Sequence, residues 1–287
     1  MDDEHFQPRR SFIFMPGVSP EMFPKALATG ADIVCIDLED AIAPQHKEDA
    51  RTRTMKLFET PQANDGVERL IRINCLRTVD GMADVQAAVA NPVPPPALML
   101  PKVASPDEVK ALDELLTEHD MPTRLHIIIE TNAGLEAAWD IAQCSARIDA
   151  MFFGGVDMAA ELRAANKWDM LLYARSRVVH AAAGAGLDVI DVPYLDLDDM
   201  AGMEREARLA AELGFTGKGS IHPKQIAPLN AVFSPSDEAI AHARRVIAAF
   251  EEGDSGLVVL DNKLIEKPVL RTMYRTVRVA EQIAARG

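Results

Sequence analysis

Short apolar runs alternate with helix-forming stretches along most of the chain, and this alternation is what most limits the possible folds. The eight expected strands are Ser11–Met15, Ile33–Leu38, Arg69–Ile73, Ala97–Leu100, Leu125–Ile129, Ala150–Phe153, Leu187–Val192 and Gly217–Ile221. Eight strands that each precede a helix are the number needed for a closed (β/α)8 barrel, the α/β fold also called a TIM barrel. An open doubly wound sheet is the structural competitor, but no G-x-G-x-x-G follows the first strand to indicate dinucleotide binding, and Gly154-Gly155 is too short a glycine motif.

The pattern changes after His222. A helix is expected from Ser234-Pro235-Ser236-Asp237 to about Glu252, followed by a hairpin of Leu257–Leu260 and Leu264–Ile265 around Asp261-Asn262. The last expected helix runs from Lys267 to Ala285. We therefore predict a catalytic barrel over residues 8–232 and a C-terminal extension over residues 233–287 that serves as a lid, an oligomer contact or both.

Composition narrows the class of protein. The chain has 44 acidic and 30 basic residues and a formal net charge of −14, which argues against a general binder of nucleic acid or anionic membranes. Its three cysteines are an odd number without metal-like spacing, which indicates reduced thiols. No apolar run approaches the roughly 18 residues of a membrane span, and the acidic start Met1-Asp2-Asp3-Glu4 is unlike a signal peptide. We expect a cytoplasmic protein.

The stretch Asp32–Asp40 combines a buried strand with concentrated negative charge. Side chains alternate between the two faces of a strand, so Asp37 and Glu39 share one face. Carboxylates at the end of a buried strand are costly unless a cation or hydrogen-bond donors neutralise them. Considered alone, this motif is more simply explained as a solvated acidic loop.

Five further strands also end in polar residues, at the end of a barrel where active sites lie. These ends are Arg72-Ile73-Asn74, Pro101-Lys102, Glu130-Thr131-Asn132, Gly154-Gly155-Val156-Asp157 and Ser220-Ile221-His222-Pro223. Singly, each residue has a plain structural explanation, such as an ion pair for Arg72, an extended rim side chain for Lys102 or a helix cap for His222. Together they predict a polar site at one rim.

Glu130 and Asp157 are the candidate metal ligands, because they follow adjacent strands of the predicted barrel. Two carboxylates without a nearby cluster of Cys or His favour a hard ion, Mg²⁺ before Mn²⁺. Asp37 and Asp40 are candidates to accept hydrogen bonds from metal-bound water. The structural alternative is a pair of salt bridges with Arg72 and Lys102.

Arg72 is the candidate anion clamp, because a guanidinium matches a carboxylate with two parallel hydrogen bonds. A second basic group, Arg9-Arg10 with Lys47, Arg51 and Arg53, stands out in an acidic chain. It is expected to form either a phosphate-binding patch beside the barrel mouth or an ordinary solvated face.

The motifs resemble those of the citrate lyase β-subunit-like family of the HpcH/HpaI aldolase group. The matching segments are Ser11–Gly17, Asp37-Leu38-Glu39-Asp40-Ala41, Arg72-Ile73-Asn74, Leu100-Pro101-Lys102-Val103, Ile129-Glu130-Thr131, Gly155-Val156-Asp157 and Ser220–Gln225. The resemblance extends from about residue 8 to the end, and it implies a (β/α)8 barrel with a C-terminal extension in a homotrimer or hexamer.

The resemblance also implies roles for single residues. Glu130 and Asp157 match the Mg²⁺ ligands, Arg72 the arginine that holds a substrate carboxyl or thioester oxygen, and Asp37 and Asp40 the acids around the water molecules of the metal.

Coenzyme A is the expected second ligand. Arg10 and Lys47 match positions near its nucleotide, and Arg9 and Lys102 are expected to contribute to the same site. Glu266 matches a catalytic aspartate that reaches into the site of a neighbouring subunit. The chain therefore departs from the family at this position by one methylene group.

The resemblance thus implies a Mg²⁺-dependent lyase. Its expected substrate is a 3-hydroxyacyl-CoA such as malyl-, β-methylmalyl- or citramalyl-CoA, cleaved to or formed from an acyl-CoA and an oxoacid, glyoxylate or pyruvate. The alternatives are a malyl-CoA thioesterase that uses the same site, a citrate lyase β subunit that acts on a carrier-bound thioester, and a barrel without catalytic activity.

Overall fold

The computed structural model describes residues 7–252, 257–260, 263–267 and 269–286. Eight parallel strands close into a barrel in chain order, from β1 to β8. The strands are β1 (Ser11–Pro16), β2 (Ile33–Asp37), β3 (Glu68–Arg72), β4 (Ala97–Leu100), β5 (Arg124–Ile129), β6 (Ile148–Phe153), β7 (Asp188–Asp191) and β8 (Gly217–Ser220). The predicted (β/α)8 barrel is therefore confirmed, and each observed strand coincides with a predicted one to within two residues.

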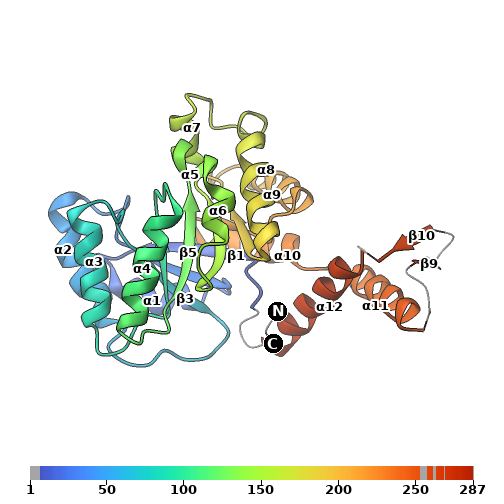
Figure 1. The fold of residues 1–287 in the computed structure, drawn as a ribbon, viewed down its shortest axis with the longest axis horizontal. Coiled ribbons are helices and arrows are strands. Elements are labelled where there is room, and N and C mark those ends of the chain that lie inside the picture. Colours follow the sequence, from blue (N-terminus) through green and yellow to red (C-terminus); the bar gives the residue numbers. More distant parts are fainter. Residues whose placement is uncertain (1–6, 253–256, 261–262, 268, 287) are drawn as a thin grey trace. The chain divides into compact units, whose positions relative to one another are not determined.

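Helices follow the strands and cover the outside of the barrel (Figure 1). They are α1 (Phe23–Leu27), α2 (Lys47–Lys56), α3 (Val79–Ala90), α4 (Pro106–Glu118), α5 (Asn132–Glu136), α6 (Ala138–Ala142), α7 (Gly155–Glu161), α8 (Trp168–Ala185), α9 (Met200–Leu213) and α10 (Ile226–Phe233). Three short 3-10 helices precede α1, α2 and α10, at Pro20–Met22, Pro44–His46 and Pro223–Gln225. No helix within the described ranges is both long and apolar enough to cross a membrane.

The barrel interior is filled by side chains of alternate strand residues. Its central cluster consists of Phe12, Ile33, Cys35, Leu70, Ala97, Met99, Ile128, Ala150, Phe152 and Ile190. Because successive side chains of a strand point to opposite faces, the residue two positions beyond each of these also faces the interior. This periodicity determines which polar residues line each end of the barrel.

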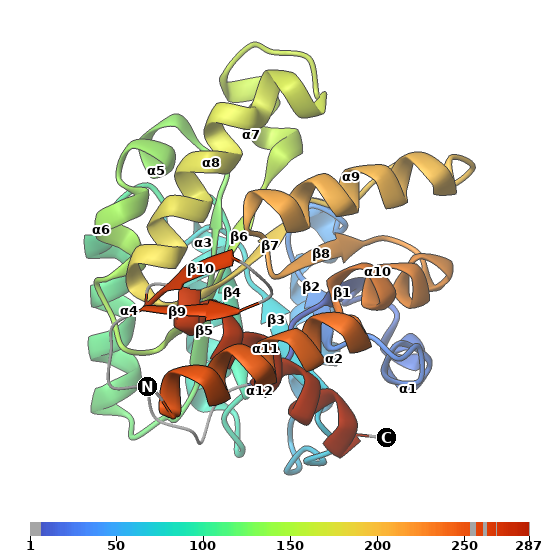
Figure 2. The same cartoon turned by 90° about the vertical axis from the view of Figure 1, so that its right-hand side faces the viewer.

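The chain divides into two compact units, one of Arg9–Asn230 and one of Met1–Pro8 with Ala231–Gly287. In the second unit, α11 (Asp237–Glu251) packs against α12 (Val269–Arg286), as Figure 2 shows. Strands β9 (Leu257–Leu260) and β10 (Lys263–Glu266) form an antiparallel pair, which agrees with the predicted hairpin. The turn predicted at Asp261-Asn262 lies outside the described residues.

Candidate active site at the carboxyl-terminal rim

Three rim residues continue the interior face of their strands. Asp37 lies two residues after Cys35 on β2, and Arg72 lies two residues after Leu70 on β3. Glu130 follows β5, two residues after Ile128. The alternation that fills the barrel with apolar side chains therefore also directs these three charged groups over the top of the apolar core.

Arg72 is held by the acids that end β2. Its Nε and Nη2 donate to the two carboxylate oxygens of Asp37 at 2.7 and 2.6 Å. Its Nη1 lies 3.1 Å from Glu39 Oε2 and 3.4 Å from Asp40 Oδ2. The guanidinium also lies 5.0 Å above the Phe14 ring. Two parallel bonds to Asp37 fix the plane of the guanidinium, so Nη1 is the end that faces the other acids.

Lys102 connects the β2 acids with Glu130. It adopts the left-handed conformation, with φ of 55°, which is uncommon for a residue other than glycine. In this conformation its backbone N–H donates to Glu130 Oε1 at 2.9 Å, while its ammonium pairs with Glu39 and lies 3.4 Å from Asp40 Oδ1. Burial opposes the charged form, but the Glu39 carboxylate outweighs it and raises the pKa of Lys102.

Glu130 is a buried carboxyl group, with 2% of its surface exposed. Burial first, and then the negative charges of Asp157 and Glu39, raise the pKa of Glu130 to about 8. Asp157 lies in the first turn of α7 and is partly exposed. Within the described ranges, neither Glu130 nor Asp157 forms an ion pair with a basic side chain, so the predicted alternative of salt bridges to Arg72 and Lys102 is not what the structure shows.

Carboxyl groups outnumber basic groups in this cluster. Its carboxylates belong to Asp37, Glu39, Asp40, Glu130 and Asp157, and its basic groups to Arg72 and Lys102. Such an excess is costly in a buried site unless a cation compensates it. The oxygen donors of Glu130 and Asp157 fit a hard divalent ion, whose remaining ligands are water and substrate oxygens. The described residues contain no group of three or more acidic, His or Cys side chains able to hold a metal.

Arg9 and Arg10 lie at the opposite end of the barrel. Arg9 pairs with Glu68, the first residue of β3, at 2.7 Å and with Asp188, the first residue of β7, at 2.9 Å. Arg10 pairs at 2.8 Å with Asp32, just before β2. Both arginines precede β1, so the direction of the strands places them at the amino-terminal end. The basic patch expected beside the mouth is therefore wrong for Arg9 and Arg10.

Lys47 lies on the rim side of the barrel, at the start of α2, but its ammonium group is fully used. It donates to the backbone oxygens of Leu38 and Glu39 and to the side-chain oxygen of Asn74. An ammonium group has three N–H donors, so none is left for a phosphate. The structure thus does not support the expected role of Lys47 as a ligand of coenzyme A.

The two other arginines of the expected patch are also paired. Arg51 donates to the buried Asp84 at 2.6 Å, and Arg53 pairs with Asp49 on the surface of α2 at 2.9 Å.

Two further predicted residues have distinct positions. His222 accepts a hydrogen bond from the backbone N–H of Lys224 at 3.1 Å, so the helix cap proposed from the sequence is confirmed. Glu266 is the last residue of β10, is exposed and pairs across the hairpin with Leu257. It lies in the C-terminal unit and therefore outside the unit that contains the rim cluster.

The predicted site set missed Glu39. This residue is 6% exposed, while the side chain of Asp40, which was predicted in its place, is 54% exposed. Burial raises the pKa of Glu39 despite the nearby Arg72. The signal that identifies Glu39 is the strand period, because residues 37 and 39 share a face and residue 40 does not.

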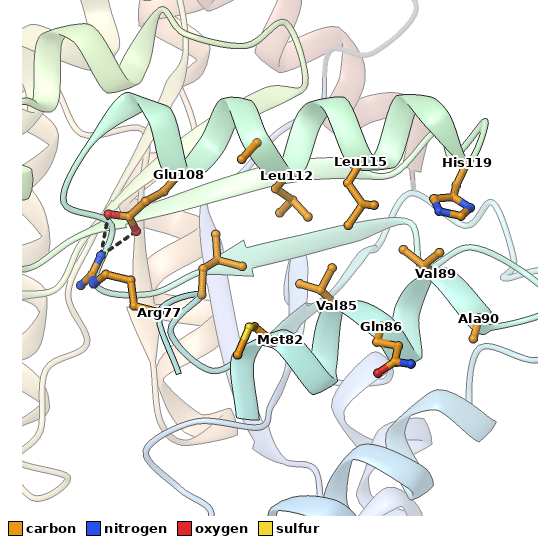
Figure 3. Close-up of a pocket in the computed structure, with 12 residues that line it drawn as sticks. Arg77, Met82, Val85, Gln86, Val89, Ala90, Glu108, Leu112, Leu115 and His119 are labelled. Carbon is orange, nitrogen blue, oxygen red and sulfur yellow. Dashed lines mark hydrogen bonds and ion pairs between the residues drawn. The ribbon is translucent and has the colours of Figure 1, made fainter. Parts of the chain in front are cut away.

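A separate groove of about 850 Å³ lies between α3 and α4 (Figure 3). Its lining is mainly apolar and includes Met82, Val85, Leu112 and Leu115, with the Arg77–Glu108 ion pair at one end. The residues around it lack the convergent charged groups of the rim. We therefore place the candidate chemistry at the rim and not in this groove.

The model of the family described as HpcH/HpaI aldolase/citrate lyase matches residues 10–223. The chain belongs to this family. The matched segment includes all eight barrel strands and every rim residue described above. The rim residues described above therefore belong to a segment that this family of enzymes shares.

Relatives and solved structures of the HpcH/HpaI aldolase/citrate lyase family extend the likeness to nearly the whole chain. The human mitochondrial citramalyl-CoA lyase is 34% identical over 96% of this chain and 86% of its own. A (3S)-malyl-CoA thioesterase of Cereibacter sphaeroides is 35% identical over 98% of this chain and 97% of its own. The CitE protein of Mycobacterium tuberculosis, crystallised with magnesium, acetoacetate and coenzyme A, is 31% identical with a TM-score of 0.77, and the match covers 96% and 99% of the two chains.

Proposed function

We propose that this chain is a Mg²⁺-dependent lyase that cleaves, or forms, a carbon–carbon bond of a 3-hydroxyacyl-CoA such as citramalyl-CoA, malyl-CoA or β-methylmalyl-CoA. The products of cleavage are an acyl-CoA and an oxoacid, pyruvate or glyoxylate. The observation that carries this proposal is the rim cluster, in which Glu130 and Asp157 form no ion pair within the described ranges while Asp37 holds Arg72 at the same rim. The 34% identity with a citramalyl-CoA lyase supports this choice of reaction.

Glu130 and Asp157 are the residues that would hold the ion, Mg²⁺ before Mn²⁺. When bound, Mg²⁺ supplies a Lewis acid for the hydroxyl and carboxylate oxygens of the substrate. The raised pKa of Glu130 fits this role, because a carboxyl group surrounded by other acids gains most from a neighbouring cation. Asp40 is proposed to accept hydrogen bonds from water at this site. The same role expected of Asp37 is not supported, because each of its oxygens already accepts from Arg72 and from a backbone N–H group, that of Glu39 or Ala41.

Arg72 is proposed to stabilise negative charge on the substrate. In cleavage the 3-hydroxyl group gives its proton to a base, its oxygen forms the C=O bond of the oxoacid, and the bond between C2 and C3 breaks with its electron pair left on the thioester as an enolate. The enolate then takes up a proton at C2. Nη1 of Arg72 is the guanidinium nitrogen that Asp37 does not bind, and a fixed cation stabilises developing negative charge without having to reorganise.

Glu266 is our candidate for the proton donor at C2, supplied by a neighbouring subunit of a homotrimer or hexamer. Its exposure at the end of β10 agrees with a role outside its own unit. We predict that Glu266→Gln retains thioester binding but lowers kcat by about 10²-fold, because proton transfer by a positioned group contributes about that factor. Steady-state kinetics with a parallel calorimetric titration of coenzyme A measure the two effects. Normal turnover by this variant would identify another group as the proton carrier.

Of the four basic residues expected to bind coenzyme A, the proposal retains only Lys102. Arg9 and Arg10 lie at the opposite end of the barrel and Lys47 has no free donor. Lys102 is 31% exposed at its side chain, and its ammonium group pairs with Glu39 and Asp40. It can therefore approach the thioester arm of the substrate.

A thioesterase with the same site is the second candidate. The 35% identity with a (3S)-malyl-CoA thioesterase favours it, as does the extra methylene of Glu266, since a small displacement of a catalytic group lowers its efficiency. Activity as a citrate lyase β subunit on a carrier-bound thioester is the third. It predicts turnover only with a thioester on an acyl carrier protein.

The deciding experiment offers purified protein synthetic malyl-, β-methylmalyl- and citramalyl-CoA with Mg²⁺ and measures oxoacid and free coenzyme A separately. The lyase produces oxoacid and acyl-CoA in equal amounts without free coenzyme A. The thioesterase releases free coenzyme A without oxoacid. Samples with EDTA and the Glu130→Ala variant are the controls, and activity that survives both would refute the metal-dependent mechanism.

The cytoplasm is the proposed location. Cys35, Cys75 and Cys144 are all unpaired, which agrees with a reducing compartment.

A further inference from the structure

A chain of buried polar contacts supports the backbone of the acidic loop that follows β2. It begins with Lys47 in the first turn of α2, passes through Asn74 after β3, and ends at Asp84 on α3 and Arg51 on α2. None of these four side chains belongs to the charged rim cluster described above. They are connected to the cluster through hydrogen bonds to the backbone oxygens of Leu38 and Glu39.

Lys47 binds the loop at two successive carbonyl groups. Its Nζ donates to Leu38 O at 2.9 Å and to Glu39 O at 2.7 Å. The third donor of the ammonium group goes to Asn74 Oδ1 at 2.6 Å. Two adjacent peptide groups on one cation cannot rotate independently, so Lys47 fixes the directions in which the Glu39 and Asp40 side chains leave the chain.

Asn74 is 6% exposed and fixed by its partners. Lysine cannot accept a hydrogen bond, so the atom facing Lys47 is the amide oxygen. The amide nitrogen then donates to Leu38 O at 3.0 Å and to Asp84 Oδ2 at 2.6 Å. Leu38 O thus accepts two hydrogen bonds from side chains, one from Lys47 and one from Asn74. These two bonds restrain the backbone of the loop after β2.

Asp84 completes the network from a fully buried position, with 0% exposure. Its Oδ2 also accepts the backbone N–H of Asn74 at 2.8 Å, and its Oδ1 accepts from Arg51 Nε at 2.6 Å. Buried networks in which every member is satisfied are rigid, and removing one member leaves the others without partners.

We propose that Lys47 and Asn74 are positioning residues that hold the β2 acids in the geometry needed around Arg72 and Lys102. This inference rests on the proposed function, because it gives the held acids a role at the metal and the substrate. It also replaces the role of Lys47 at the coenzyme A nucleotide that the sequence implied.

The test compares Lys47→Met with Lys56→Met, an exposed lysine at the end of the same helix. Calorimetry measures the affinity for Mg²⁺, and kinetics with the active thioester give kcat and KM. Lys47→Met is expected to weaken Mg²⁺ binding and to lower kcat, each by about 10- to 100-fold, because partners of metal-site groups have effects of that size. The KM for the thioester should change less than threefold, and Lys56→Met should match the wild type.

A double variant tests whether Lys47 and Asn74 act as one unit. Lys47→Met combined with Asn74→Leu should be no more impaired in Mg²⁺ affinity than the worse single variant, because residues that act together are not additive. If Lys47→Met does not fold, Lys47→Arg serves instead, since it keeps the charge but changes the donor geometry. We expect Lys47→Arg to show the same losses at a smaller size, with a Tm close to that of the wild type.

Four outcomes overturn the inference. They are unchanged Mg²⁺ affinity and kcat in the Lys47 variants, a raised KM as the only effect, full additivity in the double variant, and a wild-type protein that binds no Mg²⁺. A raised KM alone would restore Lys47 to the coenzyme A site. Mg²⁺ binding without turnover of any thioester would refute the proposed function, while the Mg²⁺ affinities would still decide the role of Lys47.

Discussion

The two ends of the barrel hold glutamates that are largely buried but have opposite electrostatic environments. Glu68 begins β3 at the amino-terminal end, and Glu130 follows β5 at the carboxyl-terminal rim. Glu68 contacts Arg9 at 2.7 Å and His126 at 2.8 Å, and these partners outweigh its burial and lower its pKa. Glu130 faces Asp157 and Glu39, and burial together with these acids raises its pKa to about 8.

The comparison shows that burial alone does not decide the state of a carboxyl group. The Glu68 side chain is 10% exposed and Glu130 is 2% exposed, so both have lost most of their water. The sign of the neighbouring charges makes the difference. At the amino-terminal end Arg9 and His126 face the Glu68 carboxylate, whereas at the rim the nearest charges to Glu130 include Asp157 and Glu39, which supports the cation proposed there.

The largest expected effect comes from removing a rim acid. Glu130→Ala and Asp157→Ala should each lower Mg²⁺-dependent kcat by about 10³-fold or more, since metal polarisation contributes several kcal/mol of transition-state stabilisation. Both variants should keep their fold, because the removed groups are not compensated by an ion pair within the described ranges. Kinetics after Mg²⁺ titration, with circular dichroism as the folding control, measure this. Full activity in either variant would show that the rim acid is not needed for catalysis.

The matching substitution at the amino-terminal end of the barrel should affect stability and not activity. Glu68→Gln should lower the free energy of unfolding by about 3 kcal/mol, because a buried arginine loses a charged partner, and should leave kcat within twofold of the wild type. Urea unfolding at pH 7 measures the loss. Glu114→Gln, an exposed glutamate on α4, is the matched control. A stable Glu68→Gln protein with impaired kcat would show that the two ends are not separate in function.

A third effect, spread over several pH units, is on the pH dependence of stability without metal. The folded-state pKa of Glu130 is about 8 against an ordinary 4.5, so between these values the folded chain binds more protons than the unfolded chain. The free energy of unfolding therefore falls as pH rises through this window. The fall is about 1.4 kcal/mol at most for each step of one in pH.

Urea unfolding in EDTA at pH 5 and pH 8 tests this, and Glu130→Gln should flatten the fall. For Glu68 the sign is reversed. Its pKa is lowered, so its contribution is present above its ordinary value of 4.5 and is lost as pH falls below it. A wild-type protein that is more stable at pH 8 than at pH 5 in EDTA would contradict the assignment for Glu130.

The barrel could be predicted from sequence because strand length and period are local properties. Most of the strands are visible as apolar runs, although β8 (Gly217–Ser220) has the sequence Gly-Lys-Gly-Ser. The polar residues that end these strands are visible as the break in the run. Asp37, Arg72 and Glu130 could be placed at one rim for this reason alone. The similarity to family members was needed to propose the reaction, but not to place these residues at the rim.

The contacts of the basic residues could not be predicted in the same way, because their partners are distant in sequence. Arg9 contacts Asp188, 179 positions away, and Lys47 contacts Asn74, 27 positions away. A charged residue near a strand in sequence lies at either end of it, and only chain direction decides which. That direction was available for Arg9 and Arg10, which precede β1, and it places them away from the mouth.

The glycine that follows β6 has a consequence for how this rim can change. A Cβ atom at position 154 would lie 2.4 Å from Glu130 Oε2 and 2.5 Å from Glu130 Cβ, which is closer than atoms approach one another without displacement. The proposed metal ligand therefore occupies the volume that a methyl group at position 154, directly after β6, would need. An alanine at 154 and an undisturbed glutamate at 130 exclude each other, so a lineage that loses this glycine must give up the carboxylate position with it.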